Sequence, residues 1–452
     1  HNIDFNKAWK AKQSGWHDQT RAIFANAEIG WKSMIYLTAT GRNDWDSRLA
    51  FSDYKSFFYP SIGLSAILTS MFNAPDWLTY LKVRGSYTEV GNSYGRFMTT
   101  VTYPYDEQTQ SWTSTSSYPN TKLKPERTKS WEVGLDARIL NDISLNLTYY
   151  RSNTYNQTFY ADLSLSSGYS NIPIQSGNIM NEGLEMSLGY NKQWKDFSFN
   201  TNYTLTWNKN RVKRLADGVY NYATGQPIQM PELSPLTYGH TDARLILRVG
   251  GSMGDVYGQR LLKRDLNGYI LNEEGVGLAM ENKETYLGSI LPKMNMGWSL
   301  GFGYKGVNLG MTFTGRFGGI VISETQSVLD AAGVSKVSAD VRDAGGVQIN
   351  QSKVSAQTYY QTIQGTAAYY TYSATNVRLG ELSLSYTLHK KWFDNKVGMT
   401  VGLVGKNLWM IYCKAPFDPE LTTSAASNFY QGFDAYMLPS TRNFGFNVKF
   451  QF

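Results

Sequence analysis

The sequence predicts an all-β fold, a transmembrane antiparallel β-barrel, and three observations carry this prediction. Segments of about ten residues alternate strictly between apolar and polar side chains, which is the period of a β-strand. The connections between these segments alternate between short and long. No run of about 18 apolar residues occurs, so a helical span is excluded, whereas a barrel needs no such run because only every second residue faces lipid.

The composition favours sheet over helix and one architecture over several. Among the 452 residues, aromatic residues make up 14%, Tyr reaches 32 and Gly 41, while charged residues stop at 17%, below the usual quarter. No Pro-rich or Gly/Ser-rich linker divides the chain. The net charge of +7 is scattered rather than clustered, which argues against a nucleic-acid groove. The single cysteine, Cys413, excludes an internal disulfide framework and disfavours a Cys-based zinc site.

The alternation is clearest in residues 443–452, NFGFNVKFQF, and it recurs along the chain. Residues 131–139 and 143–149 alternate on either side of Asn141-Asp142, which predicts a hairpin. The same pattern precedes and follows Lys195-Asp196 and Lys305-Gly306. We therefore expect a series of antiparallel strands joined by tight turns.

The charged residues in these strands occupy one parity and the apolar residues the other. Charges need water or one another, so we expect their face to line a wet lumen and the apolar face to contact lipid. The residues predicted to face the lumen are Glu132, Asp136, Arg138, Glu185 and Lys449. Those predicted to face lipid include Trp131, Leu135, Leu184, Met296, Phe446 and Phe450.

The connections fall into two classes by length. Short ones are expected near residues 30–31, 69–77, 141–142, 195–196, 250–255, 305–306 and 390–396. Long ones are expected near residues 43–55, 91–128, 153–178, 209–243, 263–290, 318–375 and 410–438. Short turns at one end and long loops at the other are typical of bacterial outer-membrane barrels, with the turns in the periplasm and the loops outside.

This count gives about fifteen strands, the first covering residues 21–29. Single-chain bacterial barrels close with an even number of strands, so we expect the wall to include further strands of the same protein. Residues 1–20 are then part of an extracellular loop, and residues 21–452 are C-terminal barrel strands with short periplasmic turns and long extracellular loops.

Several blocks resemble the C-terminal barrel of the SusC/RagA family. They include KVRGSYTEVGN (82–92), NIMNEGLEMSLGYN (178–191), DVYGQRLLKRDLNGYI (255–270), LPKMNMGWSLGFGYKGVNLGMTFTGRFGG (291–319), NVRLGELSLSYTL (376–388) and LPSTRNFGFNVKFQF (438–452). Members of this family are TonB-dependent outer-membrane transporters of Bacteroidota, with 22 strands around a plug. The resemblance implies that this chain supplies about fifteen C-terminal strands and that the plug is not in this chain.

The resemblance also implies a function and partners. It implies nutrient uptake, in which a bulky glycan or oligopeptide is delivered by a SusD-like lipoprotein that forms a lid over the long loops. Energy would come from the TonB complex through an N-terminal part absent here. The aromatic strand at the C-terminal end is similar to the signal that the insertion machinery reads in outer-membrane proteins, which would assign that role to Phe450 and Phe452.

Aromatic residues in the long loops are the predicted substrate-binding residues, because Tyr and Trp offer stacking faces to sugar rings or apolar side chains. The residues are Tyr103, Tyr105, Trp112, Tyr118, Tyr359, Tyr360, Tyr369, Tyr370, Phe429, Tyr430 and Phe433. The simpler interpretation of each is that it packs the loops together or belongs to the interfacial aromatic girdle.

Other motifs are weaker. Asp265, Asn267 and Glu273 or Glu274 are spaced somewhat like a calcium loop, but Gly268 follows Asn267 directly, which favours an Asn-Gly turn. FDPE, residues 417–420, has two carboxylates and no partner nearby in sequence, and its proline favours a fixed turn. The four histidines are isolated, so we expect no catalytic triad, no metal site and no cofactor, and no enzymatic activity.

Three alternatives remain open at this stage. A passive porin would have the same wall without a plug. An outer-membrane enzyme, such as a lipase or protease in a barrel, would carry catalytic residues that can be recognised in the sequence. A soluble all-β glycan-binding protein would not extract with membranes.

Overall fold

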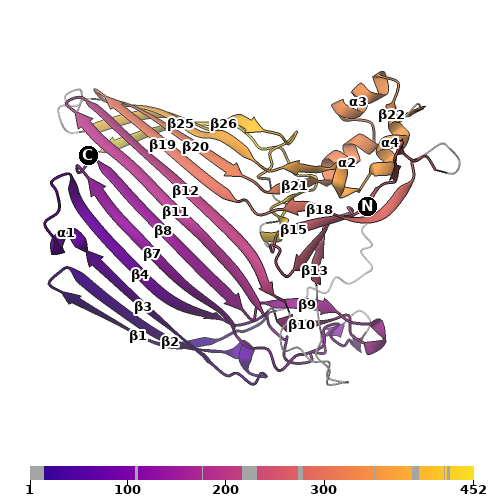
Figure 1. Cartoon of the computed structure of the whole chain (residues 1–452), viewed down its shortest axis with the longest axis horizontal. Helices are drawn as coiled ribbons and strands as arrows, with labels where there is room; N and C mark the ends of the chain where they lie inside the picture. Colours follow the sequence, from indigo (N-terminus) through magenta and orange to yellow (C-terminus); the bar gives the residue numbers. More distant parts are fainter. Residues whose placement is uncertain are drawn as a thin grey trace, which may run out of the picture.

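One large antiparallel sheet dominates the protein (Figure 1). The computed structural model describes residues 15–106, 110–175, 177–215, 232–272, 278–349, 352–388, 397–421, 423–424 and 428–451. Thirteen strands form the sheet, which we call the wall, and each pairs with the next wall strand along the chain. They are β1 (Thr20–Trp31), β2 (Ile35–Asp46), β3 (Phe57–Ile67), β4 (Leu78–Asn92), β7 (Glu126–Ile139), β8 (Ile143–Tyr155), β11 (Asn178–Trp194), β12 (Phe197–Arg214), β19 (Met294–Tyr304), β20 (Val307–Phe317), β25 (Asn376–Leu388), β26 (Gly398–Cys413) and β28 (Asn443–Gln451).

Short turns join wall strands at one end of the sheet, the turn end, on the left of Figure 1. Lys32 and Ser33, between β1 and β2, have φ of 49° and 57°, and Leu140 and Asn141, between β7 and β8, have φ of 52° and 63°. Each connection has three residues between the last paired positions, and positive φ at two successive residues is a feature of the tight turns that match the twist of a hairpin. The predicted short turns near residues 141–142, 195–196 and 305–306 are all at this end.

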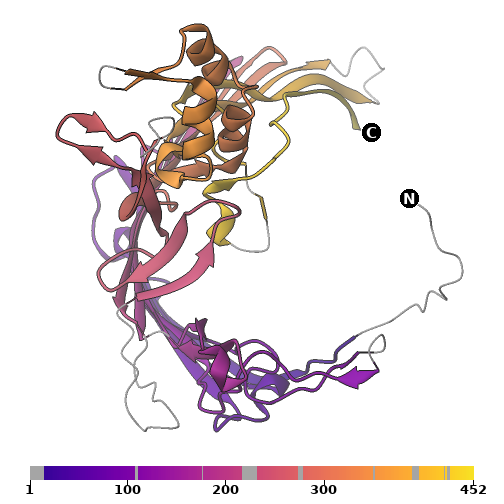
Figure 2. The ribbon, with the colours of Figure 1, turned by 90° about the vertical axis from the view of Figure 1, so that its right-hand side faces the viewer.

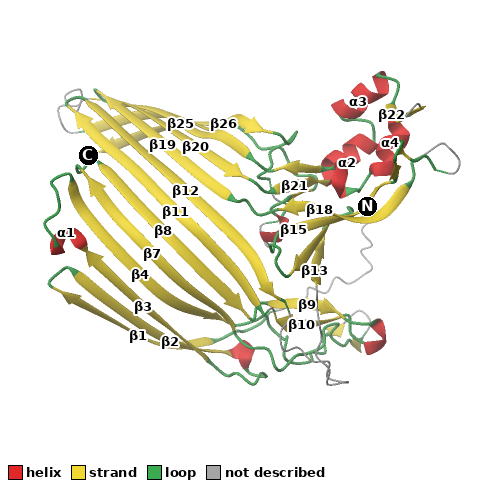
Figure 3. Ribbon diagram, viewed as in Figure 1, coloured by secondary structure: helices red, strands yellow, loops and turns green. Residues whose placement is uncertain are grey.

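The long connections gather at the opposite end, the loop end, and contain most of the remaining elements (Figure 3). The short strands there are β5 (Tyr105–Asp106), β6 (Ser111–Trp112), β9 (Thr158–Asp162), β10 (Asn171–Gln175), β13 (Glu232–Thr237), β14 (Arg244–Arg248), β15 (Asp255–Leu262), β16 (Arg264–Asp265), β17 (Gly268–Tyr269), β18 (Met280–Ser289), β21 (Ile320–Ser323), β22 (Val347–Ile349), β23 (Ser352–Val354), β24 (Thr371–Ser373) and β27 (Phe433–Asp434). The 3-10 turns are η1 (Ser47–Leu49), η2 (Leu165–Ser167), η3 (Ala367–Tyr369) and η5 (Asn428–Tyr430). At the turn end, α1 (Leu68–Met71) lies between β3 and β4.

The loop between β20 and β25, predicted as one long connection, folds into a small helical unit. It contains α2 (Glu324–Ala331), α3 (Lys336–Asp343) and α4 (Ala356–Ile363). A serine caps each helix: Ser323, Ser335 and Ser355 accept hydrogen bonds from the backbone N–H three residues on, at 2.9, 3.0 and 3.1 Å. These caps satisfy N–H groups that a helix start leaves free. In the described residues, no helix is both long and apolar enough to cross a bilayer.

The register separates the wall into two faces. Lys82 lies opposite Asp136, which lies opposite Asn146, and directly opposed residues share a face. The neighbouring row runs from Leu135 through Leu147 to Met186. We call these the polar face and the apolar face, and their alternation is the one that the sequence predicts.

The wall curves strongly, so that its cross-section is an open arc (Figure 2). Its two edges are β1 and β28, and every described residue of both strands is exposed. Neither edge has a second strand partner among the described residues.

The predicted fold class is confirmed, but the wall has thirteen strands in the described residues instead of about fifteen. The two surplus strands are β14 and β15, which flank the short connection at residues 250–255. They belong to a separate four-stranded sheet, β13-β14-β15-β18, at the loop end. β14 has 5 residues and β15 has 8, whereas a strand needs roughly 9–11 to cross the hydrocarbon layer. Leu245, Ile246 and Leu247 of β14 are all buried, so this strand is covered on both faces, and its length suits a sheet outside the hydrocarbon layer.

Buried apolar residues concentrate at the loop end. One cluster joins the β9–β10 hairpin to β13 and β14 through residues such as Ile174 and Leu247. A second surrounds Tyr238 and Leu245, and a third packs α4 against β15. The loop end is therefore folded around cores of its own, on which any binding surface is carried.

Candidate binding surface at the loop end

A hairpin formed by β5 and β6 presents the most exposed of the predicted binding aromatics. Tyr105 lies opposite Trp112 in its register, and their ring centroids are 5.0 Å apart. Trp112 is 70% exposed and Tyr103 61%. Rings held this way offer apolar faces to solvent, where a sugar ring or an apolar side chain can stack.

The other predicted aromatics pack the loops. Tyr360, Tyr370 and Phe433 are buried in loop-end cores. Tyr359 and Tyr369 pack against the α4 core, and Phe429 and Tyr430 pack against the core around Tyr238. Tyr118 packs against the β9–β10 core and meets Tyr169 edge-on at 5.1 Å.

Burial of these tyrosines also changes the pKa of their hydroxyl groups, as expected for side chains that pack the loops. It raises the pKa of Tyr359 to about 12, because an apolar environment disfavours the phenolate. The Tyr369 hydroxyl accepts a hydrogen bond from the Leu262 backbone N–H at 3.1 Å. These rings have little surface left to offer a ligand in this conformation, and their predicted role in binding stays a prediction.

A cavity of about 690 Å³ lies where the wall and the loop-end sheet separate. β12 pairs with β19 only as far as Trp207 and Met294. Beyond that point Val212 exchanges backbone hydrogen bonds of 2.8 Å with Gly250 and Gly251 instead. The lining includes Trp207, Arg211, Tyr286, Ser289 and Lys293. This volume is within the usual range for ligand pockets, and the mixture of rings, hydroxyls and cations suits a polar organic ligand.

The residues predicted to face the lumen all lie on the polar face by register, and several are joined to neighbours there. Arg84 donates to the Thr148 hydroxyl at 2.6 Å, and its Nε lies 3.8 Å from an Asp136 carboxylate oxygen. Asn146 also donates to Asp136. Glu132 lines a small cavity with Lys82 and Arg84. Arg138 contacts the Tyr80 ring, with the guanidinium carbon 5.8 Å from the ring centroid.

Glu185 and Lys449 complete this set. Glu185 lies opposite Thr148 and Thr206. Lys449 lies opposite Thr400 on the edge strand. That the polar face lines a lumen stays a prediction, supported by the physical cost of placing these charges in lipid.

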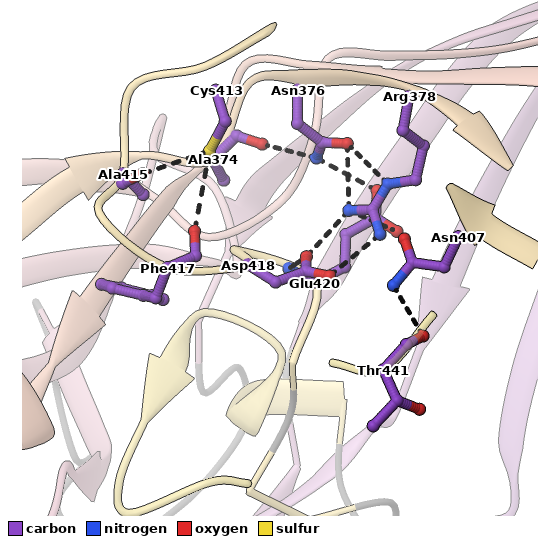
Figure 4. Close-up of polar contacts among 10 residues, drawn as sticks. All are labelled: Ala374, Asn376, Arg378, Asn407, Cys413, Ala415, Phe417, Asp418, Glu420 and Thr441. Atoms are coloured by element: carbon purple, nitrogen blue, oxygen red, sulfur yellow. Dashed lines mark hydrogen bonds and ion pairs between the residues drawn. The ribbon is translucent and has the colours of Figure 1, made fainter. Parts of the chain in front are cut away.

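The last long loop is fastened to the wall by a buried ionic cluster (Figure 4). The Arg378 guanidinium, on β25, donates to both carboxylate oxygens of Asp418 at 3.0 and 2.8 Å. These side chains are only 10% and 8% exposed. Asn376 accepts two hydrogen bonds from Arg378 and donates to Glu420 at 3.1 Å. Bidentate geometry makes this one of the stronger kinds of ion pair.

The electrostatics of Asp418 reflect two opposed effects. Burial acts to raise the pKa of its carboxyl, but hydrogen bonds from Arg378 and from the Glu420 backbone N–H outweigh burial and lower it below its ordinary value. The expectation that FDPE is a fixed turn agrees with this geometry. The sequence analysis did not identify Arg378, which lies 40 residues before its partner Asp418. The only sequence signal for Arg378 is a charge on the polar face of its strand, two residues after Asn376.

The calcium-like segment forms a turn. Asp265 accepts hydrogen bonds from the backbone N–H groups of Asn267 and Gly268 at 2.8 and 2.9 Å, closing the β16–β17 hairpin. Glu273 and Glu274 lie outside the described residues. Within the described ranges, no group of three or more His, Cys, Asp or Glu side chains is placed to hold a metal ion.

The predicted insertion signal lies on the edge strand β28. Phe450 is 53% exposed and lies opposite Met399, on the apolar face. Phe452 lies outside the described residues. The role of either residue in insertion stays a prediction.

Comparison with known proteins identifies the family of this architecture. A family model described as TonB dependent receptor-like, beta-barrel matches residues 3–279. TonB-dependent receptor P3 of Formosa agariphila is 25% identical over 468 residues, covering 95% of this chain and 45% of that protein. TonB-dependent receptor SusC of Bacteroides thetaiotaomicron is 25% identical over 217 residues, covering 47% of this chain and 19% of SusC.

A solved structure has the same fold. The RagAB peptide importer in its open-open state superposes with a TM-score of 0.72 at 20% identity, covering 96% of this chain and 46% of that chain. The chain thus spans about half the length of the RagAB chain and of TonB-dependent receptor P3.

Proposed function

Because the chain belongs to the TonB-dependent receptor-like β-barrel family, we propose that it is the larger part of the wall of an importer energised through TonB. The barrel's place is the outer membrane, and the family is a class of receptors rather than of enzymes. The cargo that we propose is a bulky nutrient, either a glycan or an oligopeptide.

The observation that carries this proposal is the sorting of the wall into two faces and two ends. A polar face with an Arg84–Asp136 contact and a Thr148 hydroxyl needs water, whereas the opposite face is apolar along most of its length. Long, folded connections at one end leave room for recognition there, and short turns at the other do not. This arrangement suits a transporter that selects its cargo outside and passes it along a wet interior.

The two edges of the wall support a second part of the proposal. Unpaired backbone groups in hydrocarbon cost several kcal/mol each, and no water is present there to compensate. We infer that β1 and β28 pair with further strands of the same protein, and that these strands surround a plug through which TonB acts. Measuring the mass of the protein isolated from its natural membrane, under denaturing conditions, tests whether these further strands belong to the same polypeptide. A folded, membrane-inserted species of only 51.0 kDa would contradict it.

A SusD-like lipoprotein is the partner that we propose for the loop end. The helical unit there exposes apolar side chains, with Val334 68% and Val337 53% exposed. Purification in mild detergent should recover a second chain, and proteolysis of the loops should release it. A barrel that always purifies alone would count against the partner. A persistent interface of this kind buries more than about 1,000 Å².

Uptake by living cells tests the transport function itself. Accumulation of a labelled glycan or peptide should depend on the protein and should stop when TonB is deleted. Uptake that persists without TonB would indicate a passive porin.

Trp112→Ala should weaken cargo binding by removing an exposed stacking face, worth about 0.5–1.5 kcal/mol beyond area burial, while Tyr169→Ala serves as a control at a packed edge-on pair.

A further inference from the structure

The three helices of the helical unit surround a cavity. α2, α3 and α4 contact one another beyond the loop end of the wall (Figure 3), and the cavity that all three line has a volume of about 500 Å³. Small residues form part of its lining, at Ala331, Ala332 and Gly333. Asp330, in the last turn of α2, lies beside them. A space of this size can take a long side chain or a small molecule.

Asp330 brings an incompletely satisfied carboxylate to this cavity. The residue is only 5% exposed. Its Oδ1 accepts hydrogen bonds from Gln326 Nε2 at 2.7 Å and from the Ser335 hydroxyl, but no residue in the described part of the chain donates to Oδ2. A buried carboxylate needs a cation or several donors, because burial removes the water that would otherwise solvate it.

The helical unit supplies no cation to this carboxylate. Asp330 forms no ion pair with any residue that the structure describes, and no basic residue occupies the last turn of α2, where the helix dipole already disfavours negative charge. The other charged residue of the lining, Arg342, donates instead to the Gly333 backbone carbonyl at 3.2 Å. Burial, and after it the charge of Asp330, raises the pKa of the Tyr370 hydroxyl. The carboxylate therefore acts on its neighbours as an unbalanced negative charge.

Exposed apolar side chains adjoin the cavity. Leu329, Val334 and Val337 are 39%, 68% and 53% exposed, and each is next in sequence to a residue that lines the cavity. A small molecule held in the cavity would leave these side chains in water. Protein interfaces, by contrast, combine an apolar centre with a long anchoring side chain in a desolvated pocket, and arginine is among the commonest anchors. The surface therefore favours a protein over a small ligand.

We propose that the helical unit binds the lipoprotein partner by taking one lysine or arginine side chain of that partner into the cavity. The inference rests on the partner named under Proposed function. The cationic group pairs with Oδ2 of Asp330, and its apolar stem lies along Ala331, Ala332 and Gly333. A charge-assisted hydrogen bond of this kind is about twice as strong as a neutral one, and the stems of Lys and Arg pack readily on apolar surface.

The experiment uses the full-length protein purified in mild detergent with its lipoprotein, which is then separated and rebound in a titration. Asp330→Asn keeps the shape of the side chain and an acceptor for Gln326 and Ser335, but removes the charge. Affinity should fall at least about thirtyfold, because the cation of the partner is left buried without its counter-charge. Asp343→Asn removes an exposed carboxylate from α3. This matched control should bind with normal affinity.

A second variant tests the cavity without changing the carboxylate. Ala332→Trp places a large ring at an exposed position of the lining, just after α2, so it should also block the partner. Its matched control is Ala344→Trp, at the equivalent exposed position after α3 and outside the lining, which should bind with near-normal affinity. Hydrogen exchange in α2 and α4 reports whether the helical unit is folded in each variant.

The outcomes separate this proposal from the proposed function. If no lipoprotein accompanies the wild type, the partner itself is wrong and the docking site falls with it. If the wild type, Asp330→Asn and Ala332→Trp bind the lipoprotein equally, the docking site is overturned while the partner stands. Free L-arginine serves as a probe for a small ligand. If it binds the wild type and not Asp330→Asn while lipoprotein affinity is unchanged, the cavity is a small-molecule site and the docking proposal is wrong. Equal weakening by Asp330→Asn and Asp343→Asn would show a non-specific charge effect and would also reject it.

Discussion

The wall and the loop end are built on different principles although one chain alternates between them. In the wall, backbone ladders join the strands, and most side chains are exposed or half-buried on one of two faces. At the loop end, compact clusters bury residues such as Leu245 and Tyr238 completely. The wall depends on its surroundings to cover its apolar face, whereas the loop end covers its own.

This difference predicts how each region responds to substitution. A loop-end residue should behave as a residue in a water-soluble domain, where cavities and unpaired charges dominate the cost. A wall residue should respond to which face it occupies and how deep in the bilayer it lies. The Arg378–Asp418 cluster lies at the boundary, because its arginine is on a wall strand and its carboxylate is in a loop.

Asp418→Ala should have the largest effect on the loop end. It leaves the buried Arg378 charge without its bidentate partner, and breaking a buried pair costs about 3–5 kcal/mol. Hydrogen exchange in residues 414–421 should rise sharply while the wall strands stay protected. Asp340→Ala is the matched control, because its pair with Lys336 is exposed at both ends and is worth about 1 kcal/mol or less. Equal increases in hydrogen exchange around the two substituted residues, Asp418 and Asp340, would contradict the expected difference between buried and surface ion pairs.

Leu245→Ala should destabilise the loop end next most. Leu245 is fully buried, and a leucine-to-alanine cavity costs about 2–5 kcal/mol. The control Leu384→Ala removes a side chain that is 49% exposed on the wall, where surrounding lipid fills the space. The thermal unfolding temperature of the purified protein should fall more for Leu245→Ala than for Leu384→Ala. A larger fall for Leu384→Ala would contradict the contrast between the two regions.

Met186→Arg and Glu185→Arg test the two faces of the wall at adjacent positions. Met186 lies opposite Leu147 and Leu205 in the apolar row, and an arginine facing mid-membrane lipid costs about 2–4 kcal/mol, while an aqueous lumen accepts it. Met186→Arg should therefore reduce the amount of folded barrel in outer-membrane fractions, and Glu185→Arg should leave it near normal. Similar yields of the two variants would contradict the assignment of the faces.

Acid should loosen the last loop before it affects the wall, with the smallest effect of the four. Because the folded-state pKa of Asp418 is lowered, its contribution is complete above the ordinary carboxyl pKa of about 4 and declines as pH falls through the lowered value. Protease cleavage within residues 414–421 should increase below about pH 4 in the wild type. Asp418→Asn should give a profile with less pH dependence, and a matching profile would rule out this carboxyl as the cause.

Several features of the wall followed from the sequence because they are local. Alternation with a period of two places neighbours such as Leu184 and Glu185 on opposite faces whatever lies elsewhere in the chain. Connection lengths separated the turn end from the loop end. The tight turns at residues 141–142 and 305–306 were visible from their residue types and their flanking strands.

Other features required the tertiary structure. Only contacts between distant segments show that Arg378 holds Asp418, that β14 and β15 join a separate sheet, and that Tyr360 and Tyr370 are buried while Trp112 is exposed. The sequence by itself determined the strand period, the two faces and the two ends, because these depend on backbone geometry within a few residues. The tertiary structure alone decided the number of wall strands and the accessible aromatics, because burial and pairing depend on which remote segments pack together.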